Sequence, residues 1–346
     1  MRSATSLTGY SKFPEVTFSG IQPTGIPHIG NFLGALSNWV SPQQTTSITK
    51  TALYTIVDLH ALTVPQDPTQ LRKNKVDMTI SLLACGLDPA TVLTYLVDLG
   101  TSTFRMCMDS KLYYANRMAK SQKKNVQSIE DADTSSGLCL GLLAYPVLQA
   151  ADILLYKATH VPIGEDNVQH LELARDIAQK INKLYKQDIF PLPQPILAPA
   201  KRIMSLRDPT KKMSKSDPLE QSRINLNDLP STIALKIKKA TTDTIKGITY
   251  DPENRPAISN LVTIYAAVQG VDVEEIVEEH SASDTMKFKE ALTNVLIEKL
   301  TPLQKEIERL KNEHGYVQQV LQEGNEKASL IANKNLDELY KLFGLR

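Results

Sequence analysis

Residues 18–31 combine the side chains and the backbone best suited to binding a phosphate. The stretch is Phe-Ser-Gly-Ile-Gln-Pro-Thr-Gly-Ile-Pro-His-Ile-Gly-Asn, and its glycines and prolines break any regular element before Asn31. Glycine lets a phosphate approach the backbone, and the free N–H groups at a helix start attract anions. His28 and Asn31 stand at that entrance with side chains that can donate hydrogen bonds. The stretch indicates a nucleotide site, with an ordinary β–α turn of an α/β protein as the alternative.

A second stretch, residues 203–218, gathers lysines and serines around Met213. Lys212 and Lys215 flank Met213, and Asp-Pro follows. Lysine carries a compact charge on a long stem, so a mobile loop of this kind suits the binding of a polyphosphate. A solvated surface loop is the alternative, since most charged runs of this kind are solvated.

The elements around these stretches alternate between strand and helix. Apolar residues before the first loop favour a buried strand, and those after it recur at helical spacing: Val16, Phe18 and Ile21, then Phe32, Leu33, Leu36 and Val40. Further strands are predicted at 53–57, 92–99 and 160–164, and helices at 71–85, 148–157 and 166–185. Asp166 is predicted to cap the last helix, whose inward residues are Leu171, Ala174, Ala178 and Ile181. This alternation predicts an α/β fold with a doubly wound parallel sheet.

The second half of the chain has a helical pattern from Asp228 onward. One apolar stripe runs from Phe288 to Leu310, and a final helical stretch from Val317 to Leu342 is expected to break near Gly324. This pattern predicts a separate helical bundle, with a boundary between residues 217 and 229.

The composition is that of an ordinary globular protein with room for one large and one smaller domain. The chain has 346 residues, of which 42% are hydrophobic and 22% charged, with a net charge of +1. No apolar run is long enough to cross a bilayer. Cys85, Cys107 and Cys139 form no CxxC or Cys/His pattern, so neither a disulfide framework nor structural zinc is expected. A reducing compartment fits this cysteine usage best.

Residues 1–15 have the composition of a short mitochondrial leader. They contain Arg2, Lys12 and several serines and threonines, with no acid before Glu15. A disordered N-terminus has the same composition, so both interpretations stand.

The two loops together resemble those of the class I aminoacyl-tRNA synthetases. Residues 27–31, Pro-His-Ile-Gly-Asn, look like the HIGH signature with asparagine in the last place, and residues 212–216, Lys-Met-Ser-Lys-Ser, match the KMSKS signature in full. Within that class the chain resembles the tryptophanyl-tRNA synthetases of the bacterial and mitochondrial type, over 17–93 and from 117 to the C-terminus. The stretches that carry this resemblance are 18–25, 57–61, 145–154, 161–166 and 247–261. It implies a Rossmann-like catalytic domain over 16–217, with a helical insertion, and a helical anticodon-binding domain over 218–346.

The resemblance also implies which residues hold ATP. It gives catalytic roles to His28, Asn31, Lys212 and Lys215 and places Lys124 as a further phosphate-binding lysine. The set implied for ATP is Gln22, Pro23, Thr24, His28, Ile29, Gly30, Asn31, Lys124, Gly164, Glu165, Asp166, Ile203, Lys212, Met213, Ser214, Lys215 and Ser216.

For tryptophan, the resemblance makes Asp152 the acceptor of the indole N–H. A helix carboxylate facing solvent is the alternative, but Asp152 stands between Ala151 and Ile153 on a largely apolar helix, which favours burial. The set implied for tryptophan is Phe18, Gly20, Tyr145, Gln149, Asp152, Val161, Ile163 and Asn167.

The implied reaction is attack of the tryptophan carboxylate on the α-phosphate of ATP, followed by transfer to tRNA(Trp). It needs positioning and charge stabilisation of the leaving pyrophosphate, with Mg²⁺ carried by ATP, and no protein nucleophile, protein-bound metal or zinc. The resemblance further implies a homodimer without membrane attachment, in the mitochondrial matrix or, alternatively, in a bacterial-type cytoplasm. Basic residues of the helical half could meet tRNA phosphates or be solvated helix faces: Lys236, Lys238, Lys239, Lys305, Arg309 and Lys311.

The sequence departs from the family pattern at three places. Asn167 stands where glutamine is usual, Gln149 stands where bacterial members carry methionine, and residues 96–116 match poorly and lack a histidine found there in the family. The alternatives are therefore a tyrosyl-tRNA synthetase, a non-catalytic paralogue that binds RNA, or a small nucleotidyltransferase. The last would not explain the helical half or the lysine loop.

Overall fold

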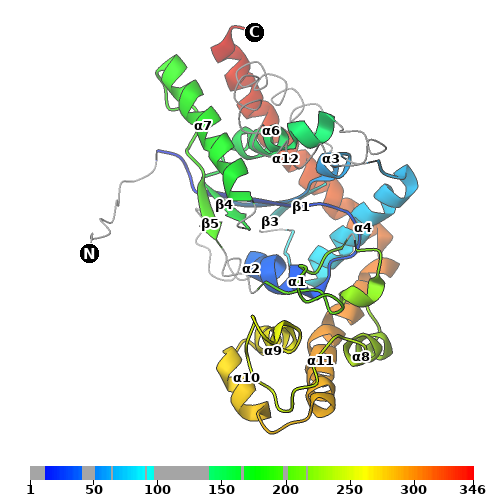
Figure 1. The fold of residues 1–346 in the computed structure, drawn as a ribbon. Coiled ribbons are helices and arrows are strands. Elements are labelled where there is room, and N and C mark those ends of the chain that lie inside the picture. The colour runs from blue at the N-terminus through cyan, green and yellow to red at the C-terminus, as the bar shows by residue number, and fades with distance from the viewer. Residues whose placement is uncertain are drawn as a thin grey trace, which may run out of the picture.

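A parallel five-stranded sheet forms the centre of the upper part of the molecule (Figure 1). The computed structural model describes residues 12–40, 51–63, 65–89, 92–96, 140–164, 167–197, 202–215 and 217–346. The strands are β1 Val16–Ile21, β2 Thr51–Ile56, β3 Val92–Leu96, β4 His160–Ile163 and β5 Gln194–Leu197. They lie in the order β3-β2-β1-β4-β5, and every neighbouring pair is parallel. The predicted doubly wound α/β class is confirmed; residues 97–99 of the predicted third strand lie outside the described residues.

One side of the sheet is covered by α6 Leu140–Leu155, α7 Val168–Tyr185 and the C-terminal half of α12 His314–Phe343 (Figure 1). The inward residues predicted for α7 are buried, as its amphipathic spacing requires. The core here joins Phe18 and Leu53 of the sheet to residues from all three helices, including Ala328, Ala332, Leu336 and Leu339 of α12. The last helix of the chain therefore stabilises the sheet part directly.

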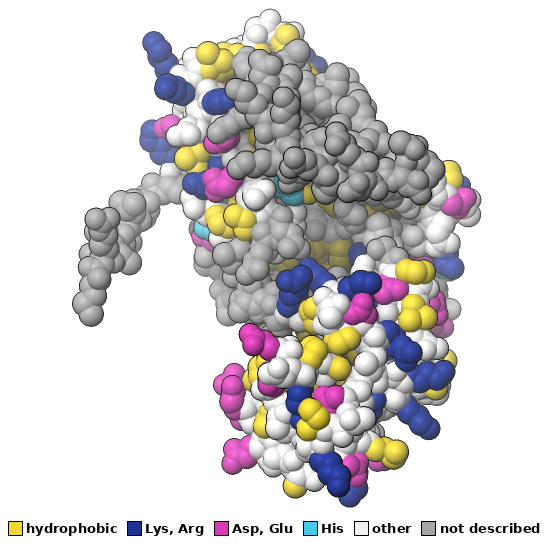
Figure 2. Space-filling model, viewed as in Figure 1, with side chains coloured by type: hydrophobic (Ala, Val, Ile, Leu, Met, Phe, Trp, Pro, Cys, Tyr) yellow, Lys and Arg dark blue, Asp and Glu magenta, His cyan; other side chains and the backbone are white. Residues whose placement is uncertain are grey.

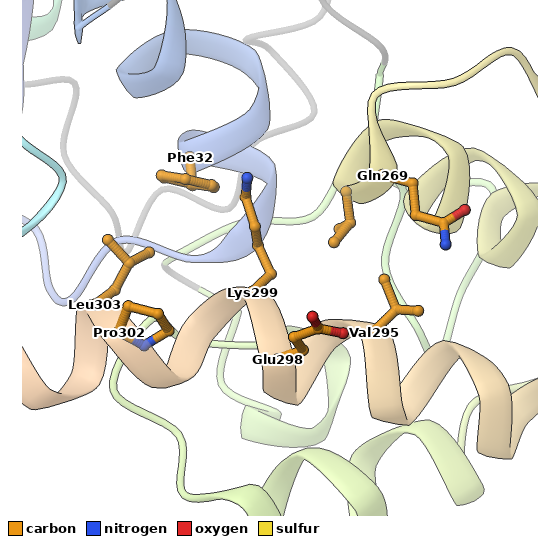
Figure 3. Close-up of a pocket in the computed structure, with 8 residues that line it drawn as sticks. Phe32, Gln269, Val295, Glu298, Lys299, Pro302 and Leu303 are labelled. Atoms are coloured by element: carbon orange, nitrogen blue, oxygen red, sulfur yellow. The ribbon is translucent and has the colours of Figure 1, made fainter.

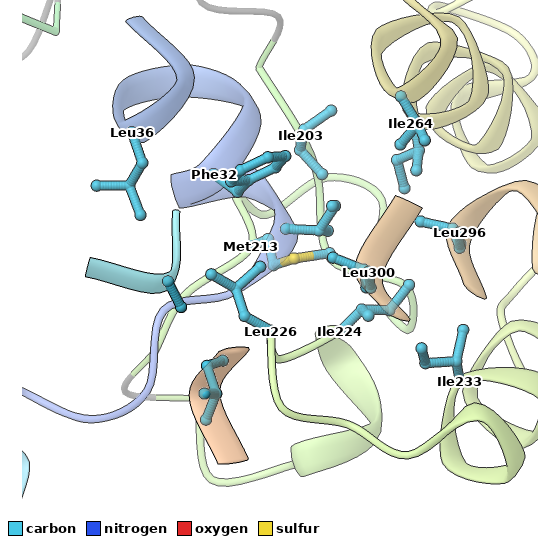
Figure 4. Close-up of a cluster of buried hydrophobic side chains, with 14 of the residues drawn as sticks. Phe32, Leu36, Ile203, Met213, Ile224, Leu226, Ile233, Ile264, Leu296 and Leu300 are labelled. Atoms are coloured by element: carbon cyan, nitrogen blue, oxygen red, sulfur yellow. The ribbon is translucent and has the colours of Figure 1, made fainter. Parts of the chain in front are cut away.

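The other core joins the sheet to the helical half of the chain. It includes residues of α1 Ile29–Asn31, the π-helix η1 Phe32–Leu36, α2 Ser37–Val40 and α4 Pro68–Ala84. The same cluster continues through Met213 and Ile224 to Leu296 and Leu300 of α11 Thr285–Asn312 (Figure 4). The helical half thus shares a buried core with the sheet part. The division of the chain after residue 217 stays a prediction.

From residue 228 onward the described chain is mainly helical, as the pattern predicted. The helices are α8 Pro230–Lys238, α9 Pro256–Gln269, α10 Val273–His280, α11 Thr285–Asn312 and α12. The predicted break near Gly324 is wrong, because α12 runs unbroken for 30 residues and buries Gly324. Tertiary packing here outweighs the low helix propensity of glycine, which costs only about 1 kcal/mol.

Two helix starts also differ from the prediction. Helix α6 begins at Leu140, before the expected residue 148, and contains Pro146 within it. Helix α7 begins after Asn167, so the residue at its cap is not the predicted Asp166, which lies outside the described residues. The two remaining short elements are α3 Asp58–Ala61 and the 3₁₀ turn η5 Glu220–Ser222. None of the helices in the described ranges has the length and apolarity needed to cross a membrane.

Candidate active site

The predicted site lies where the strand order of the sheet reverses. In the chain β1 is followed by β2 and β3 on one side of it, whereas β4 and β5 lie on its other side. In open parallel sheets a crevice forms at such a point, outside the carboxyl ends of the strands, and ligands bind there. The loop after β1 carries His28 and the loop after β4 begins at Gly164. The loop after β1 and the loop after β4 both carry residues predicted to bind ATP, and both therefore leave the same edge of the sheet.

His28 and Asn31 hold each other through a reciprocal cap at the start of α1. The Asn31 backbone N–H donates to His28 Nδ1 at 3.3 Å, and the His28 backbone N–H donates to Asn31 Oδ1 at 3.1 Å. Because Nδ1 accepts a hydrogen bond, the neutral imidazole carries its proton on Nε2. The predicted donor role of His28 therefore falls to Nε2 alone.

The surroundings of His28 are strongly positive. Burial first, and then the charges of Lys215, Arg223 and Lys212, together lower the pKa of His28 to about 3. His28 is consequently neutral at pH 7, and the cationic side chains of Lys215, Arg223 and Lys212 lie near it. This arrangement suits a neutral hydrogen-bond donor beside a polyphosphate.

Arg223 is a candidate residue that the sequence analysis missed. Its guanidinium donates from Nη1 to the Asp217 carbonyl at 2.7 Å and from Nε to Asn225 Oδ1 at 3.2 Å. Asn225 forms an antiparallel bridge with His28, and the Ile29 N–H donates to the Ile224 carbonyl at 2.8 Å. These bonds hold the segment that carries Arg223 against the loop after β1 and the short helix α1, residues 22–31, together named the histidine loop. Its place just after the lysine-rich stretch was the only sequence signal.

The lysine-rich stretch is a paired hairpin and not a freely solvated loop. The Met213 N–H donates to the Ile203 carbonyl at 3.0 Å, and the Ser205 N–H donates to the Lys211 carbonyl at 2.8 Å. The Met213 side chain is buried with Ile203 in the core (Figure 4). If Met213 binds ATP as predicted, only its backbone is available for it.

Lys215 connects this hairpin to the loop after β1. Its Nζ donates to the Gln22 carbonyl at 2.8 Å. Burial lowers the pKa of Lys215 to about 8, so the amine remains mainly charged at pH 7. Lys212, by contrast, has an exposed side chain. The two lysines predicted to bind pyrophosphate thus occupy different environments.

The other residues predicted for ATP divide by burial. Pro23, Ile29 and Ile203 are buried, and Gly30 lies against Ile203, since a Cβ added to Gly30 would be 3.4 Å from Ile203 Cβ. Gln22 and Gly164 are exposed, and Thr24, Gly30, Asn31 and Ser214 are partly exposed. The predictions for Lys124, Glu165, Asp166 and Ser216 lie outside the described residues.

Asp152 is buried and paired with a histidine from another element. The Asp152 side chain of α6 is 8% exposed, and its Oδ2 lies 2.9 Å from His60 Nε2 on α3. The solvent-facing alternative for Asp152 is therefore wrong. His60 can donate to Oδ2, which orients the carboxylate so that its other oxygen can accept a hydrogen bond from a ligand.

Tyr145, His170 and Asn167 form a second polar group near this pair. Tyr145 Oη lies 2.8 Å from His170 Nε2, and His170 Nδ1 lies 3.1 Å from Asn167 Oδ1. The rings of His60 and Tyr145 are in edge contact, with centroids 6.3 Å apart. Burial lowers the pKa of His170, which favours a neutral ring donating to Asn167 and accepting from Tyr145. Two residues predicted for tryptophan are thus joined by a histidine that was not predicted.

The remaining residues predicted for tryptophan come from β1, α6 and β4. Phe18 and Val161 are buried in the core beneath α6, where Phe18 stacks on Tyr156. Gly20 is exposed at the end of β1, and a Cβ there would lie 2.8 Å from a Val57 methyl carbon. Only glycine therefore fits there without displacing Val57. Gln149 and Ile163 are partly exposed.

A cavity of about 560 Å³ lies at the junction between the sheet part and the helical part (Figure 3). Its described lining comes from η1, α9 and α11 and consists of Phe32, Val268, Gln269, Val295, Glu298, Lys299, Pro302 and Leu303. None of these residues was predicted to bind ATP or tryptophan. In the part of the chain that the structure describes, no group of three or more His, Cys, Asp or Glu side chains could hold a metal ion.

The basic residues predicted to meet tRNA do not all face solvent. Figure 2 shows Lys and Arg side chains projecting from the lower part of the molecule on the side where α8 lies, and Lys238 and Lys239 are exposed. Lys236 is wrong as a phosphate contact, because its side chain is 4% exposed and its Nζ lies 2.5 Å from Asp228 Oδ2. Arg309 is paired with Glu306 and Glu313 along α11.

The comparisons with known proteins agree over nearly the whole chain. The family model described as class I tRNA synthetases (W and Y) matches residues 13–301. The mitochondrial tryptophan--tRNA ligase of Dictyostelium discoideum is 41% identical over 96% of this chain and 97% of its own. The tryptophan--tRNA ligase of Thermosynechococcus vestitus is 40% identical over 94% of this chain and 98% of its own. The solved tryptophanyl-tRNA synthetase of Mycoplasma pneumoniae has a TM-score of 0.79 and 32% identity, and the match covers 96% of this chain and 99% of that structure.

Proposed function

The chain belongs to the tryptophan--tRNA ligases, a family of class I tRNA synthetases, and we propose which of its residues perform tryptophan activation and transfer to tRNA(Trp). Relatives that are 40–41% identical are tryptophan enzymes, which disfavours the tyrosyl alternative. The observation that carries the proposal is the cluster of Lys212, Lys215 and Arg223 around a neutral His28 at the reversal point of the sheet.

On the ATP side, this chain supplies hydrogen-bond donors and positive charge. His28 Nε2–H and the backbone N–H groups at the start of α1 bind phosphate oxygens. Lys212 and Lys215 bind the pyrophosphate, which gains negative charge as its bond to the α-phosphorus breaks. Mg²⁺ enters with ATP as part of the substrate, since phosphate oxygens are the ligands it prefers. Arg223 adds a guanidinium charge near His28.

On the tryptophan side, Asp152 accepts the indole N–H and His60 fixes the orientation of the carboxylate. A buried acceptor rejects side chains without a donor, because the carboxylate would then lose its partner. Asn167 faces the substrate amino group in the place where the family usually has glutamine. Its oxygen accepts from His170 and has a second lone pair, so this oxygen is the atom that can also accept a hydrogen bond from the substrate amino group.

The finer assignments extend this proposal. Exposed Lys238 of α8 and Lys239 at its C-cap bind tRNA phosphates, a homodimer forms, and the protein acts in the mitochondrial matrix. Mitochondrial relatives at 38–41% identity support the compartment, while bacterial relatives of similar identity define the alternative. Light scattering of the purified protein tests the dimer, and imaging of the full chain in cells tests the compartment.

The decisive experiment is ATP–pyrophosphate exchange by the purified full chain with tryptophan and, in parallel, with tyrosine. Exchange that depends on tryptophan alone supports the proposal. Exchange with tyrosine alone would make the chain a tyrosine enzyme. A folded protein that catalyses no exchange but binds RNA would be the non-catalytic paralogue, and residues 96–116 would then be the first segment to examine.

A further inference from the structure

The lysine hairpin, which pairs residues 203–205 with 211–213, has one backbone edge that no further strand of the described chain joins. A single side chain covers this edge. Met204 and Lys212 face each other as an antiparallel pair, and the bonds that flank them come from Ser205 to Lys211 and from Met213 to Ile203. A pair flanked in this way exchanges no hydrogen bonds of its own. The N–H and C=O of Met204 therefore point outward, toward where a third strand would lie.

Asn260 of α9 occupies the place of that third strand. Its Oδ1 accepts from the Met204 N–H at 2.9 Å, and its Nδ2 donates to the Met204 C=O at 3.0 Å. Asn260 is 5% exposed, and its carboxamide offers the same donor and acceptor as a peptide group. Within the described ranges, these are the hydrogen bonds that the two Met204 backbone groups make.

The two hydrogen bonds between Asn260 and Met204 form a clamp, which joins α9 to the lysine hairpin and, through it, to the histidine loop. Ile203, next to Met204, lies against Gly30 in the histidine loop, and Lys212 lies across the hairpin from Met204. The clamp spans 56 residues of sequence, so it fixes the hairpin to a helix outside the sheet part. Loss of the clamp would free the strand that faces Lys212.

We propose that Asn260 is a positioning residue for amino-acid activation, which holds the hairpin so that Lys212 and Lys215 meet the pyrophosphate. This inference rests on the proposed function, since it takes these lysines as ligands of the pyrophosphate. Effective positioning depends on sub-ångström placement, so a displaced hairpin lowers the rate without touching tryptophan. Asn260 acts through the hairpin and makes no contact with substrate.

The test compares Asn260→Asp with a matched variant, Asn182→Asp. Asn182 of α7 clamps a loop in the same manner: it accepts from the Ile189 and Phe190 N–H groups and donates to the Phe190 C=O at 2.8 Å. Each substitution keeps the acceptor and turns the donor into an oxygen that faces a carbonyl. We expect Asn260→Asp to lower kcat or raise the ATP KM of pyrophosphate exchange by about tenfold, with tryptophan affinity unchanged. The Asn182→Asp variant should lose a similar free energy of unfolding but keep the kcat and ATP KM of the parent protein.

Two further measurements keep the inference falsifiable if Asn260→Asp folds poorly. Met204→Pro removes the N–H that donates to Asn260 and keeps the hairpin bonds from Ser205 and Met213, although it also fixes φ at position 204 and restricts Ile203. It should reproduce the defect, while Met204→Ala, which keeps the N–H, should not. Hydrogen–deuterium exchange should be faster in the 203–215 peptide of the Asn260→Asp and Met204→Pro variants. In a Lys215→Ala background the Asn260 effect should shrink, because both act on the same step.

Normal kinetics in folded Asn260→Asp and Met204→Pro, together with impaired Lys215→Ala, would overturn the inference and leave the proposed function intact. Equal kinetic losses in Asn182→Asp and Asn260→Asp would also overturn it, since a general loss of stability would then suffice. Normal kinetics in Lys215→Ala would instead refute the assignment of the hairpin lysines to the pyrophosphate, on which the inference rests. If hydrogen–deuterium exchange of the 203–215 peptide were still faster in Asn260→Asp, Asn260 would stabilise the hairpin without any role in activation.

Discussion

Replacing Lys215 by alanine should slow adenylate formation far more than it weakens tryptophan binding. Lys215 Nζ contacts the Gln22 carbonyl of the histidine loop, and its charge is one of those that lower the pKa of His28. The leaving pyrophosphate gains charge only as its bond to the α-phosphorus breaks. A lysine at this place therefore binds most strongly in the transition state, and such interactions appear in kcat.

The magnitude follows from the number and setting of the lost contacts. One charge-assisted contact in a partly closed site contributes about 2–4 kcal/mol, or about 10²–10³-fold in rate. Lys215 is only partly exposed, and burial lowers its pKa to about 8, so its charge is poorly screened by water and the upper half of that range applies. Lys212 is exposed and its charge is better screened, so Lys212→Ala should cost less in rate than Lys215→Ala.

The assay is single-turnover adenylate formation alongside equilibrium binding of tryptophan. Tryptophan lies on the other side of the α-phosphate, so its affinity should remain close to that of the parent protein. A control variant, Lys238→Ala, removes an exposed lysine of α8 and should leave adenylate formation unchanged. A normal single-turnover rate for Lys215→Ala would show that the hairpin is a structural feature with no part in activation.

Three further predictions address pH, specificity and stability. Burial lowers the pKa of Lys215, so its charge is present below about pH 8 and lost above it; kcat/KM of pyrophosphate exchange should fall through that pH, and Lys215→Arg should move the fall to higher pH. Asp152→Ala should cut the preference for tryptophan over phenylalanine by about 1–3 kcal/mol in competitive exchange, and an unchanged preference would exclude Asp152 as the indole acceptor. Lys236→Met should lower the free energy of unfolding by about 3–5 kcal/mol in urea titrations, because it leaves the buried Asp228 carboxylate without its partner; a loss no larger than that of exposed Lys238→Met would contradict this.

Much of the sheet part could be predicted because its signals are local. The glycine–proline loop, His28 and the cap at Asn31 lie within a few residues of one another, and period-2 and helical patterns located the strands and helices around them. Burial of Asp152 also followed from local context, since its neighbours on α6 are apolar.

The errors and omissions come from contacts between distant segments. Lys236 has the pattern of a solvated helix lysine, and only the position of Asp228 beside it explains its burial. His60 and Asp152 are 92 residues apart, and the Asn260 clamp spans 56, so no periodicity links either pair. Gly324 was expected to end a helix, but burial of the surrounding residues outweighs the intrinsic cost of glycine. Local propensity determines which elements are available, while tertiary partners determine which charges are buried.

The contact between the last helix and α6 has a consequence for synthesis on the ribosome. Asn335 of α12 donates from Nδ2 to the Leu155 carbonyl at 2.7 Å, and Leu336 and Leu339 lie in the core beneath α6. Helix α6 carries Asp152, so the support of this carboxylate is completed by a residue that is translated 180 codons after Leu155. Between the synthesis of α6 and that of α12, the nascent chain lacks the part of this core that α12 supplies. The growing chain thus exposes an apolar surface of α6 over that interval, and chaperones that bind exposed apolar segments are expected to recognise it.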